Sequence, residues 1–273
     1  MKTIFSKTII ACAVAAASMF AGAAQAADVY PNFTVDPVGI SDNFTADKIT
    51  GNYVEVATFG AGGVFNVSLR WEAGQFVAND GKNAVLDTGL GERGQYGMYA
   101  LYTASGIAAT DATGKTTFTF TPGSGSFQLF LDGGRNNGAT TLPTNGSGSF
   151  TTVGSGDDTL LASGTALSGL GTLDPNLSTC KNGGINCGSF GSSTTFDLTA
   201  DGKLFFVAPN PFYNLSFQSG QLNNFTPTAT QIINGSLDVT FGSAPSVVPE
   251  PASAALLGLG LLGLGLARRR KQA

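Results

Sequence analysis

Alternation of apolar and polar positions dominates the middle of the chain. In the segment 64–71, VFNVSLRW, the apolar side chains Phe65, Val67, Leu69 and Trp71 fall at every second position. A period of two places them on one face of a strand, so we expect Trp71 in the core. The alternation recurs in segments 116–121, 126–132, 195–200, 213–218 and 236–241. One buried face and one wet face are typical of antiparallel sheets.

Three further segments are apolar on both faces and indicate strands beneath a covering layer. They are residues 53–59, 97–104 and 203–208. No segment between the two termini keeps a helical period of 3.6 over three turns, and Gly and Pro interrupt the chain at short intervals. The sequence therefore predicts an all-β protein with an antiparallel β-sandwich or jelly-roll-like body, filled largely by phenylalanine.

The stretch 133–193 differs from the rest because it is rich in Gly, Ser, Thr and Asn. We interpret it as a loop insertion on the surface, with short strands at 149–153 and 158–163. Loops of this length are usually functional or mobile. A glycine-rich linker between two domains is the alternative interpretation.

The N-terminus has the pattern of a secretory signal peptide. Two lysines precede an apolar run of residues 9–20, and the small residues Ala24 and Ala26 then stand where signal peptidase reads the chain. We expect cleavage after Ala26, which removes residues 1–26 together with their helix. The β body then covers 27–242, with the loop insertion inside it, and a linker follows at 243–248.

Charge and composition narrow the classes of function. Six of the 14 basic residues lie in the two terminal segments, so the body is more acidic than the net charge of −4 for the whole chain. An acidic surface repels phosphates, which argues against nucleic acid as a partner. The chain has no histidine, and this excludes Ser-His-Asp and Cys-His catalysis and His-ligated metal sites. We expect no metal and no cofactor.

Two cysteines remain after the signal peptide, Cys180 and Cys187. An even count in an exported protein favours a disulfide. A metal site formed by the two thiolates is the alternative, but no other ligand types lie nearby in the sequence.

Candidate binding and catalytic residues are few. The body has three glutamates, Glu55, Glu72 and Glu92, and a polysaccharide-acting enzyme would pair two carboxyl groups across a cleft. No local motif singles out such a pair. Tyr96 and Tyr102 share one face of the same predicted strand, with Tyr99 on the other. We take Tyr96 and Tyr102 as a candidate glycan contact.

The C-terminal segment 249–273 has three parts. Pro249, Glu250 and Pro251 come first, the apolar residues 252–267 follow, and a basic cluster including Arg268, Arg269 and Arg270 ends the chain. As a helix the apolar part spans roughly 24 Å, less than the hydrocarbon core of about 30 Å. The basic cluster would stay in the cytoplasm. We therefore expect a transient inner-membrane contact and a hydrophobic helix that is a poor permanent anchor.

This segment resembles the PEP-CTERM sorting signal in the order and spacing of its three parts. The resemblance implies processing near the Pro-Glu-Pro motif by an exosortase, a membrane protease-transpeptidase. Such tails occur in Gram-negative bacteria that make extracellular polysaccharide, and they sort proteins to the outer surface or matrix.

Segments 32–37, 44–56 and 64–76 resemble the flocculation-associated PEP-CTERM proteins, which as a family are linked to floc formation. The resemblance brings no catalytic residues. We therefore expect a non-enzymatic protein of the cell surface or matrix that associates with exopolysaccharide and promotes cell aggregation. A carbohydrate-binding module and a carboxylate-dependent enzyme acting on polysaccharide are the alternatives.

Overall fold

The structure is a computed structural model that describes residues 30–37, 39–91, 95–181, 186–220 and 222–242. It is mostly β, and every ladder between named strands is antiparallel, which confirms the predicted all-β class. The two terminal helices that the sequence predicts lie outside the described residues. Among the described residues, no helix has both the length and the apolar character needed to cross a membrane.

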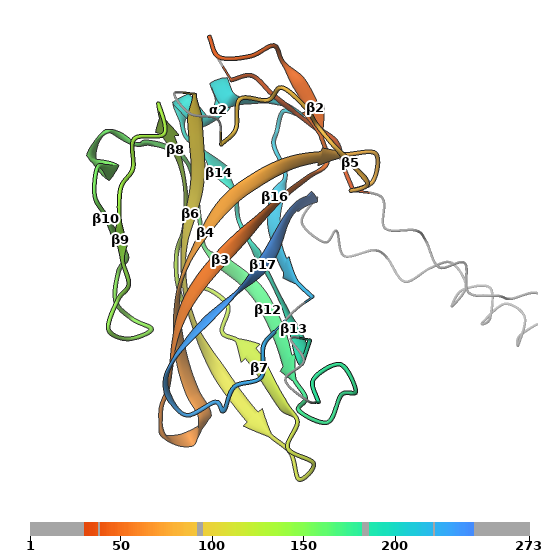
Figure 1. The fold of residues 1–273 in the computed structure, drawn as a ribbon, viewed down its shortest axis with the longest axis vertical. Coiled ribbons are helices and arrows are strands. Elements are labelled where there is room, and N and C mark those ends of the chain that lie inside the picture. Colours follow the sequence, from red (N-terminus) through yellow and green to blue (C-terminus); the bar gives the residue numbers. More distant parts are fainter. Residues whose placement is uncertain (1–29, 38, 92–94, 182–185, 221, 243–273) are drawn as a thin grey trace, which may run out of the picture.

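One large sheet forms the body (Figure 1). Its strands are β3 (Lys48–Phe59), β4 (Val64–Ala78), β5 (Asn83–Ala84), β6 (Tyr96–Thr110), β7 (Thr116–Phe120), β8 (Phe127–Gly133), β11 (Thr159–Gly164), β12 (Ala166–Leu173), β13 (Gly188–Thr194), β14 (Asp197–Leu198), β16 (Asn214–Ser219) and β17 (Ala229–Gly242). A short 3₁₀ turn, η1 (Ala61–Gly63), joins β3 to β4.

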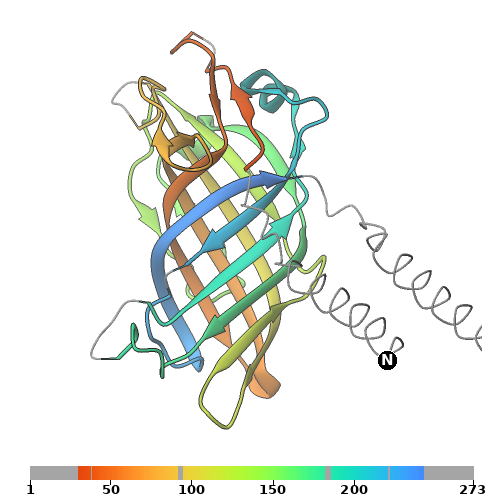
Figure 2. The ribbon, with the colours of Figure 1, turned by 90° about the vertical axis from the view of Figure 1, so that its right-hand side faces the viewer.

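The sheet closes on itself and makes a barrel-like body (Figure 2). From β6 the neighbours run through β7, β12, β13, β16, β17, β3 and β4, and β4 pairs again with β6. β17 and β3 are paired from Ala229↔Phe59 to Thr240↔Lys48. The two packed faces expected of a sandwich are therefore opposite walls of one continuous sheet.

Large rings fill the interior, and several lie against a glycine of the neighbouring strand. Phe65 pairs with Gly106, and Phe118 pairs with Gly171. A Cβ atom at Gly106 would lie 2.6 Å from the ring of Phe65, so only glycine leaves room there. The predicted core residue Trp71 is 1% exposed and faces Gly51 in the same way.

A small second sheet covers one end of the barrel. It consists of β1 (Phe33–Val35), β2 (Phe44–Ala46) and β15 (Phe206–Ala208), and the short helix α2 (Ala200–Phe205) precedes β15 (Figure 1). The rings of Phe33 and Phe241 meet edge to face at 4.8 Å, so this cap joins the aromatic core of the barrel.

The helix α2 corrects part of the prediction for 203–208, because Lys203–Phe205 are helical and only the following residues form a strand. The Thr199 side chain explains the difference, since it accepts a hydrogen bond from the Gly202 N–H at 3.0 Å and caps the helix.

The range 133–193 contains more of the sheet than a loop insertion would. Its first part is an arm with a small hairpin, β9 (Thr140–Thr141) and β10 (Thr151–Thr152), which runs outside β6 and β8 (Figure 1). The turn η2 (Ser155–Asp157) ends the arm. After it, β12 and most of β13 belong to the closed circuit of strands, and β11 extends the same sheet beside β8. Glycines interrupt the alternation of apolar and polar side chains in this range, because rings of neighbouring strands occupy the space of their side chains. The alternation therefore did not predict the barrel strands β12 and β13.

A candidate polar site on the outer face of the sheet

A polar hollow of about 290 Å³ lies on the outer face, where β4 and β6 run side by side and the arm begins. Its polar and aromatic lining consists of Arg70, Glu72, Tyr99, Asp132, Arg135 and Asn137.

Strand register brings the central side chains together. Glu72 of β4 pairs with Tyr99 of β6, and Tyr99 pairs with Phe130 of β8. Arg70 stands two residues before Glu72 and therefore shares its face of the strand. Glu72, Tyr99 and Phe130 form one row across the outer face of the sheet, and Arg70 lies beside this row, two residues along β4.

Arg70 is the buried positive charge of the hollow, with only 5% of its side chain exposed. Its Nε and Nη2 atoms donate to Oε1 of Glu72 at 3.3 and 3.0 Å, and its guanidinium lies 4.0 Å from the centre of the Tyr99 ring. The other face of Tyr99 stacks on Phe130 at 5.1 Å. The Arg70 Nη1 atom is buried and has no hydrogen-bond partner among the described residues. Arg70 therefore has a donor that no described residue uses.

The arm contributes an acceptor. The Asn137 Nδ2 atom donates to Asp158 at 2.9 Å, while Asn137 Oδ1 is buried without a partner in the described part of the chain. The Asp132 carboxylate fixes this turn by accepting the backbone N–H groups of Asn136 and Asn137 at 2.9 and 3.3 Å. The start of the arm is thus held by hydrogen bonds from two sides.

Tyr99 acts as a permanent donor in this arrangement. Its hydroxyl donates to Oδ2 of Asp158 at 2.6 Å. Burial raises the pKa of Tyr99, and the hydrogen bond and negative charge of Asp158 raise it further. The phenol therefore stays protonated at neutral pH, and its ring supports Arg70 instead of offering a free stacking face.

The hollow suits uncharged hydroxyl groups. A buried donor on Arg70 and an acceptor on Asn137 can each serve a hydroxyl, which both donates and accepts. The carboxylates of Glu72 and Asp132 offset the positive charges of Arg70 and Arg135, so the hollow has no strong preference for an anion. Within the described residues, no three His, Cys, Asp or Glu side chains gather as a metal site would require.

The structure places Tyr96 and Tyr102 inside the barrel instead of on its surface. They are 0% and 3% exposed, and the Tyr102 hydroxyl is 2.8 Å from that of Ser192. The predicted glycan contact through these two rings is therefore wrong, because neither ring can reach a polymer. Their shared face was correctly predicted, and so was the opposite orientation of Tyr99.

The candidate carboxylates are separated. Glu72 lies at the outer hollow, whereas Glu55 points into the barrel, and Glu92 is outside the described residues. Sequence analysis missed Arg70 and Asn137. The only signal for Arg70 is a charge two residues before Glu72 on the polar face of a strand, and nothing local shows that the arm will cover it.

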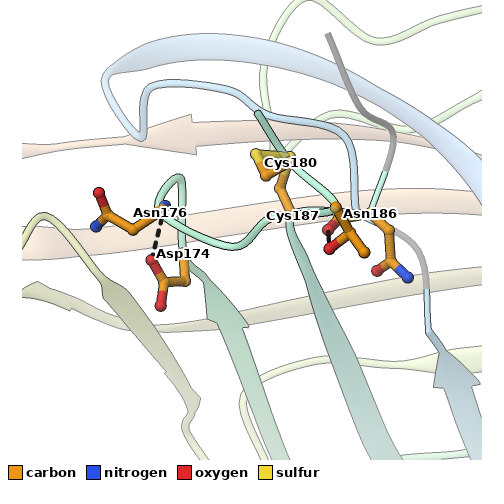
Figure 3. The surroundings of a disulfide bond; sticks show 6 residues. Asp174, Asn176, Cys180, Asn186 and Cys187 are labelled. Carbon is orange, nitrogen blue, oxygen red and sulfur yellow. Dashed lines mark hydrogen bonds between the residues drawn. A yellow bond between two sulfur atoms is a disulfide. The ribbon is translucent and has the colours of Figure 1, made fainter. Parts of the chain in front are cut away.

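The predicted disulfide between Cys180 and Cys187 is confirmed, and it closes the loop between β12 and β13 (Figure 3). The same loop has a turn in which the Asn176 N–H donates to Asp174 at 2.9 Å. The Thr179 hydroxyl donates to the carbonyl of Asn186 at 2.7 Å across the loop.

The processing residues at both termini lie outside the described residues. They are Ala24, Ala26, Pro249, Glu250, Pro251, Arg268, Arg269 and Arg270. For the C-terminal group, a comparison with protein families supplies the evidence.

Residues 247–271 match the family described as PEP-CTERM protein-sorting motif. The C-terminal segment of the chain is therefore a PEP-CTERM sorting signal, as the order of its three parts predicts. The motif is the recognition signal for exosortase processing and implies export toward the cell surface in a Gram-negative bacterium. None of the curated proteins compared with the chain matches it. The solved structures give no match either.

Proposed function

We propose that this protein is a non-enzymatic component of the cell surface or extracellular matrix that binds exopolysaccharide and promotes cell aggregation. In this account the tail holds the chain briefly in the inner membrane, and the exosortase then releases it near Pro249–Pro251. The sorting motif supports the location. The observation that carries the binding role is the buried, partly unpaired guanidinium of Arg70 in a polar hollow.

The geometry favours a neutral sugar unit as the bound group. Sugar hydroxyls can accept from Arg70 Nη1 and donate to Asn137 Oδ1, and both atoms are otherwise buried without partners among the described residues. Leaving such atoms unpaired destabilises the protein, and a ligand that pairs them recovers that free energy. The proposed binding does not include stacking of a sugar ring on Tyr99, because Arg70 and Phe130 occupy the two faces of the Tyr99 ring.

A binding assay tests the proposal with the mature protein purified from the producing cells and the polysaccharide of the same cells. We expect Arg70→Met to weaken binding about tenfold or more, since hydrogen bonds to charged groups contribute about 1.5–3 kcal/mol. Lys82→Met is the matched control, because it removes one exposed positive charge from a side chain that does not line the hollow. Equal losses for both variants would contradict a specific site and indicate a general charge effect.

Two further results decide between this function and its rivals. Shortening of the polysaccharide during incubation with the purified protein would show an enzyme and overturn the non-enzymatic role. Normal flocculation of cells that lack the gene, under conditions where the parent strain flocculates, would overturn the role in aggregation.

A further inference from the structure

A cleft of about 380 Å³ opens at the capped end of the barrel. One wall comes from β14 and α2, and the other comes from β15 and the residues 209–212 that follow it (Figure 1). Its volume lies within the range of small-ligand sites, roughly 300–1,000 Å³. None of its lining residues lines the outer hollow, so the cleft and the hollow are separate places on the molecule.

The wall that α2 forms is fixed to the barrel. The Thr199 hydroxyl donates to the Leu160 carbonyl of β11 at 2.7 Å and accepts from the Gly202 N–H at 3.0 Å. A Cβ atom at Gly202 would overlap the carbonyl oxygen of Leu161, so the helix packs directly on the backbone of β11. These contacts hold the backbone of Lys203 in place at the rim of the cleft.

The opposite wall is fixed by aromatic packing and by proline. The ring of Phe212 lies edge to face at 5.2 Å from Phe241, at the end of β17, and also 5.2 Å from Phe206. Pro209 and Pro211 restrict the backbone just before Phe212, because their rings fix φ. The cleft is therefore formed before any ligand arrives, which lowers the entropy that binding costs.

Phe212 gives the cleft an accessible aromatic surface. It is half-buried, whereas Phe196 and Phe206 beside it are 5% and 2% exposed and close the floor. One face of a pyranose ring carries mainly C–H groups, which bury apolar area against an aromatic ring. The cleft thus offers the packing surface that Tyr99 in the outer hollow lacks.

Three polar side chains stand around this apolar surface. Asp197, Lys203 and Asn210 line the cleft and are exposed, and none of their side chains has a hydrogen bond or ion pair with another described residue. A carboxylate only accepts, an ammonium group only donates and an amide does both, so hydroxyl groups satisfy all three. The negative and the positive charge cancel, which favours a neutral ligand over a polyanion.

The cleft repeats the combination of groups in the outer hollow, which is a cation, a carboxylate and an asparagine. We propose that it is a second binding site, for sugar units of the same polysaccharide. This inference rests on the proposed function of the hollow. A molecule with two separate sites can hold two polymer chains together, which a single site cannot do, and cell aggregation requires such links.

Light scattering of the polysaccharide during addition of the mature protein tests for the second site. We expect the apparent polymer size to rise and then fall as wild-type protein is added, because excess protein occupies the chains through one site at a time. The double variant Asp197→Ala/Asn210→Ala should still bind the polysaccharide through the hollow but should produce no rise. Asp201→Ala is the matched control and should behave as the wild type, since it removes an exposed carboxylate of α2 that does not line the cleft.

Two results would overturn the second site: a full rise in polymer size with the double variant, or binding by the wild type that never raises the polymer size. Circular dichroism checks that the double variant is folded, as we expect because both of its substituted side chains are exposed.

Arg70→Met separates a failure of the cleft from a failure of the hollow. Complete loss of binding in Arg70→Met would contradict the cleft, because the polymer should still bind there. Unchanged binding in Arg70→Met, together with lost binding in the double variant of the cleft, would support the cleft and overturn the hollow. Absence of binding by the wild type would overturn both.

Discussion

At the scale of single residues, the buried carboxyl of Glu55 makes the stability of the folded protein depend on pH. Burial raises the pKa of its carboxyl from 4.5 to about 7. In the unfolded chain the group ionises near its ordinary pKa, so between these two values the folded protein binds more protons. Stability contributed by the neutral carboxyl is therefore lost as pH rises through this window, and it stays lost above the folded pKa.

Glu55→Gln should consequently stabilise the protein at pH 8 by up to about 3 kcal/mol, since each unit of pKa shift corresponds to roughly 1.4 kcal/mol. At pH 4 the gain should nearly vanish, because the wild-type carboxyl is then neutral in both states. Urea unfolding at the two pH values measures the difference. An equal effect of the substitution at both would contradict the burial of an ionisable Glu55.

Interior glycines make a second residue-scale prediction. A Cβ atom at Gly51 would lie 2.2 Å from the backbone oxygen of Glu72 and 2.4 Å from Nε1 of Trp71. The Trp71 indole cannot easily move away, because that Nε1 donates to the Leu237 carbonyl at 3.0 Å. We expect Gly51→Ala to reduce the free energy of unfolding by about 2 kcal/mol or more.

Gly133→Ala is the matched control for this prediction. Gly133 also lies in a strand, but a Cβ atom there meets nothing within 4 Å. Its unfolding free energy should stay close to that of the wild type. Equal destabilisation by both substitutions would contradict a specific role for the close contact with Trp71.

Period-two patterns predicted correctly which residues point inward wherever side chains are large. Phe65, Val67, Leu69 and Trp71 are all buried. The pattern failed in β12 and β13, where glycine replaces a side chain because a ring from the neighbouring strand occupies its space. Whether such a glycine faces the interior can be predicted only when its partner strand is known. A single segment of sequence does not identify that partner.

At the scale of elements, the disulfide loop is the clearest predicted feature. Cysteine count and export predicted the bond between Cys180 and Cys187, and the structure forms it between two buried residues. The hydrogen bond between the Cys187 N–H and the Leu222 carbonyl could not be predicted, because it joins segments that only strand pairing brings together.

Replacing both cysteines with alanine should lower the free energy of unfolding by about 2 kcal/mol, the amount that closing a loop this short contributes through chain entropy. Thermal unfolding of the wild type with and without a reducing agent gives an independent measure of the same quantity. The double variant should not respond to the reducing agent. A wild-type protein whose melting temperature is unaffected by reduction would contradict a stabilising role for the bond.

The arm with β9 and β10 shows the limits of sequence analysis at this scale. Its composition predicted a surface loop, and the arm is one. Its position over the outer face depends on contacts far along the chain, such as the Gly146 N–H donating to the Thr58 hydroxyl at 2.9 Å. The outer hollow arises from that position, which explains why Arg70 was not recognised as a candidate binding residue.

At the scale of the whole molecule, two kinds of information come from different parts of the chain. The tail carries the sorting signal as a short linear motif, and all residues of such a motif can be recognised in the sequence alone. Closure of the sheet depends on the pairing of β17 with β3 and of β4 with β6, between strands that the alternation alone leaves unpaired. Sequence therefore predicted the antiparallel β class and the destination better than it predicted the closed arrangement or the polar hollow.

The central claim is that the chain is sorted to the cell surface and loses its tail on the way. Intact-mass spectrometry of the protein recovered from the surface or the medium tests it most directly. We predict a mature chain that begins at Ala27 and ends near Pro249–Pro251, and an uncleaved C-terminus in cells without the exosortase. A surface protein that still carries Arg268–Lys271 would contradict the account and indicate a retained anchor.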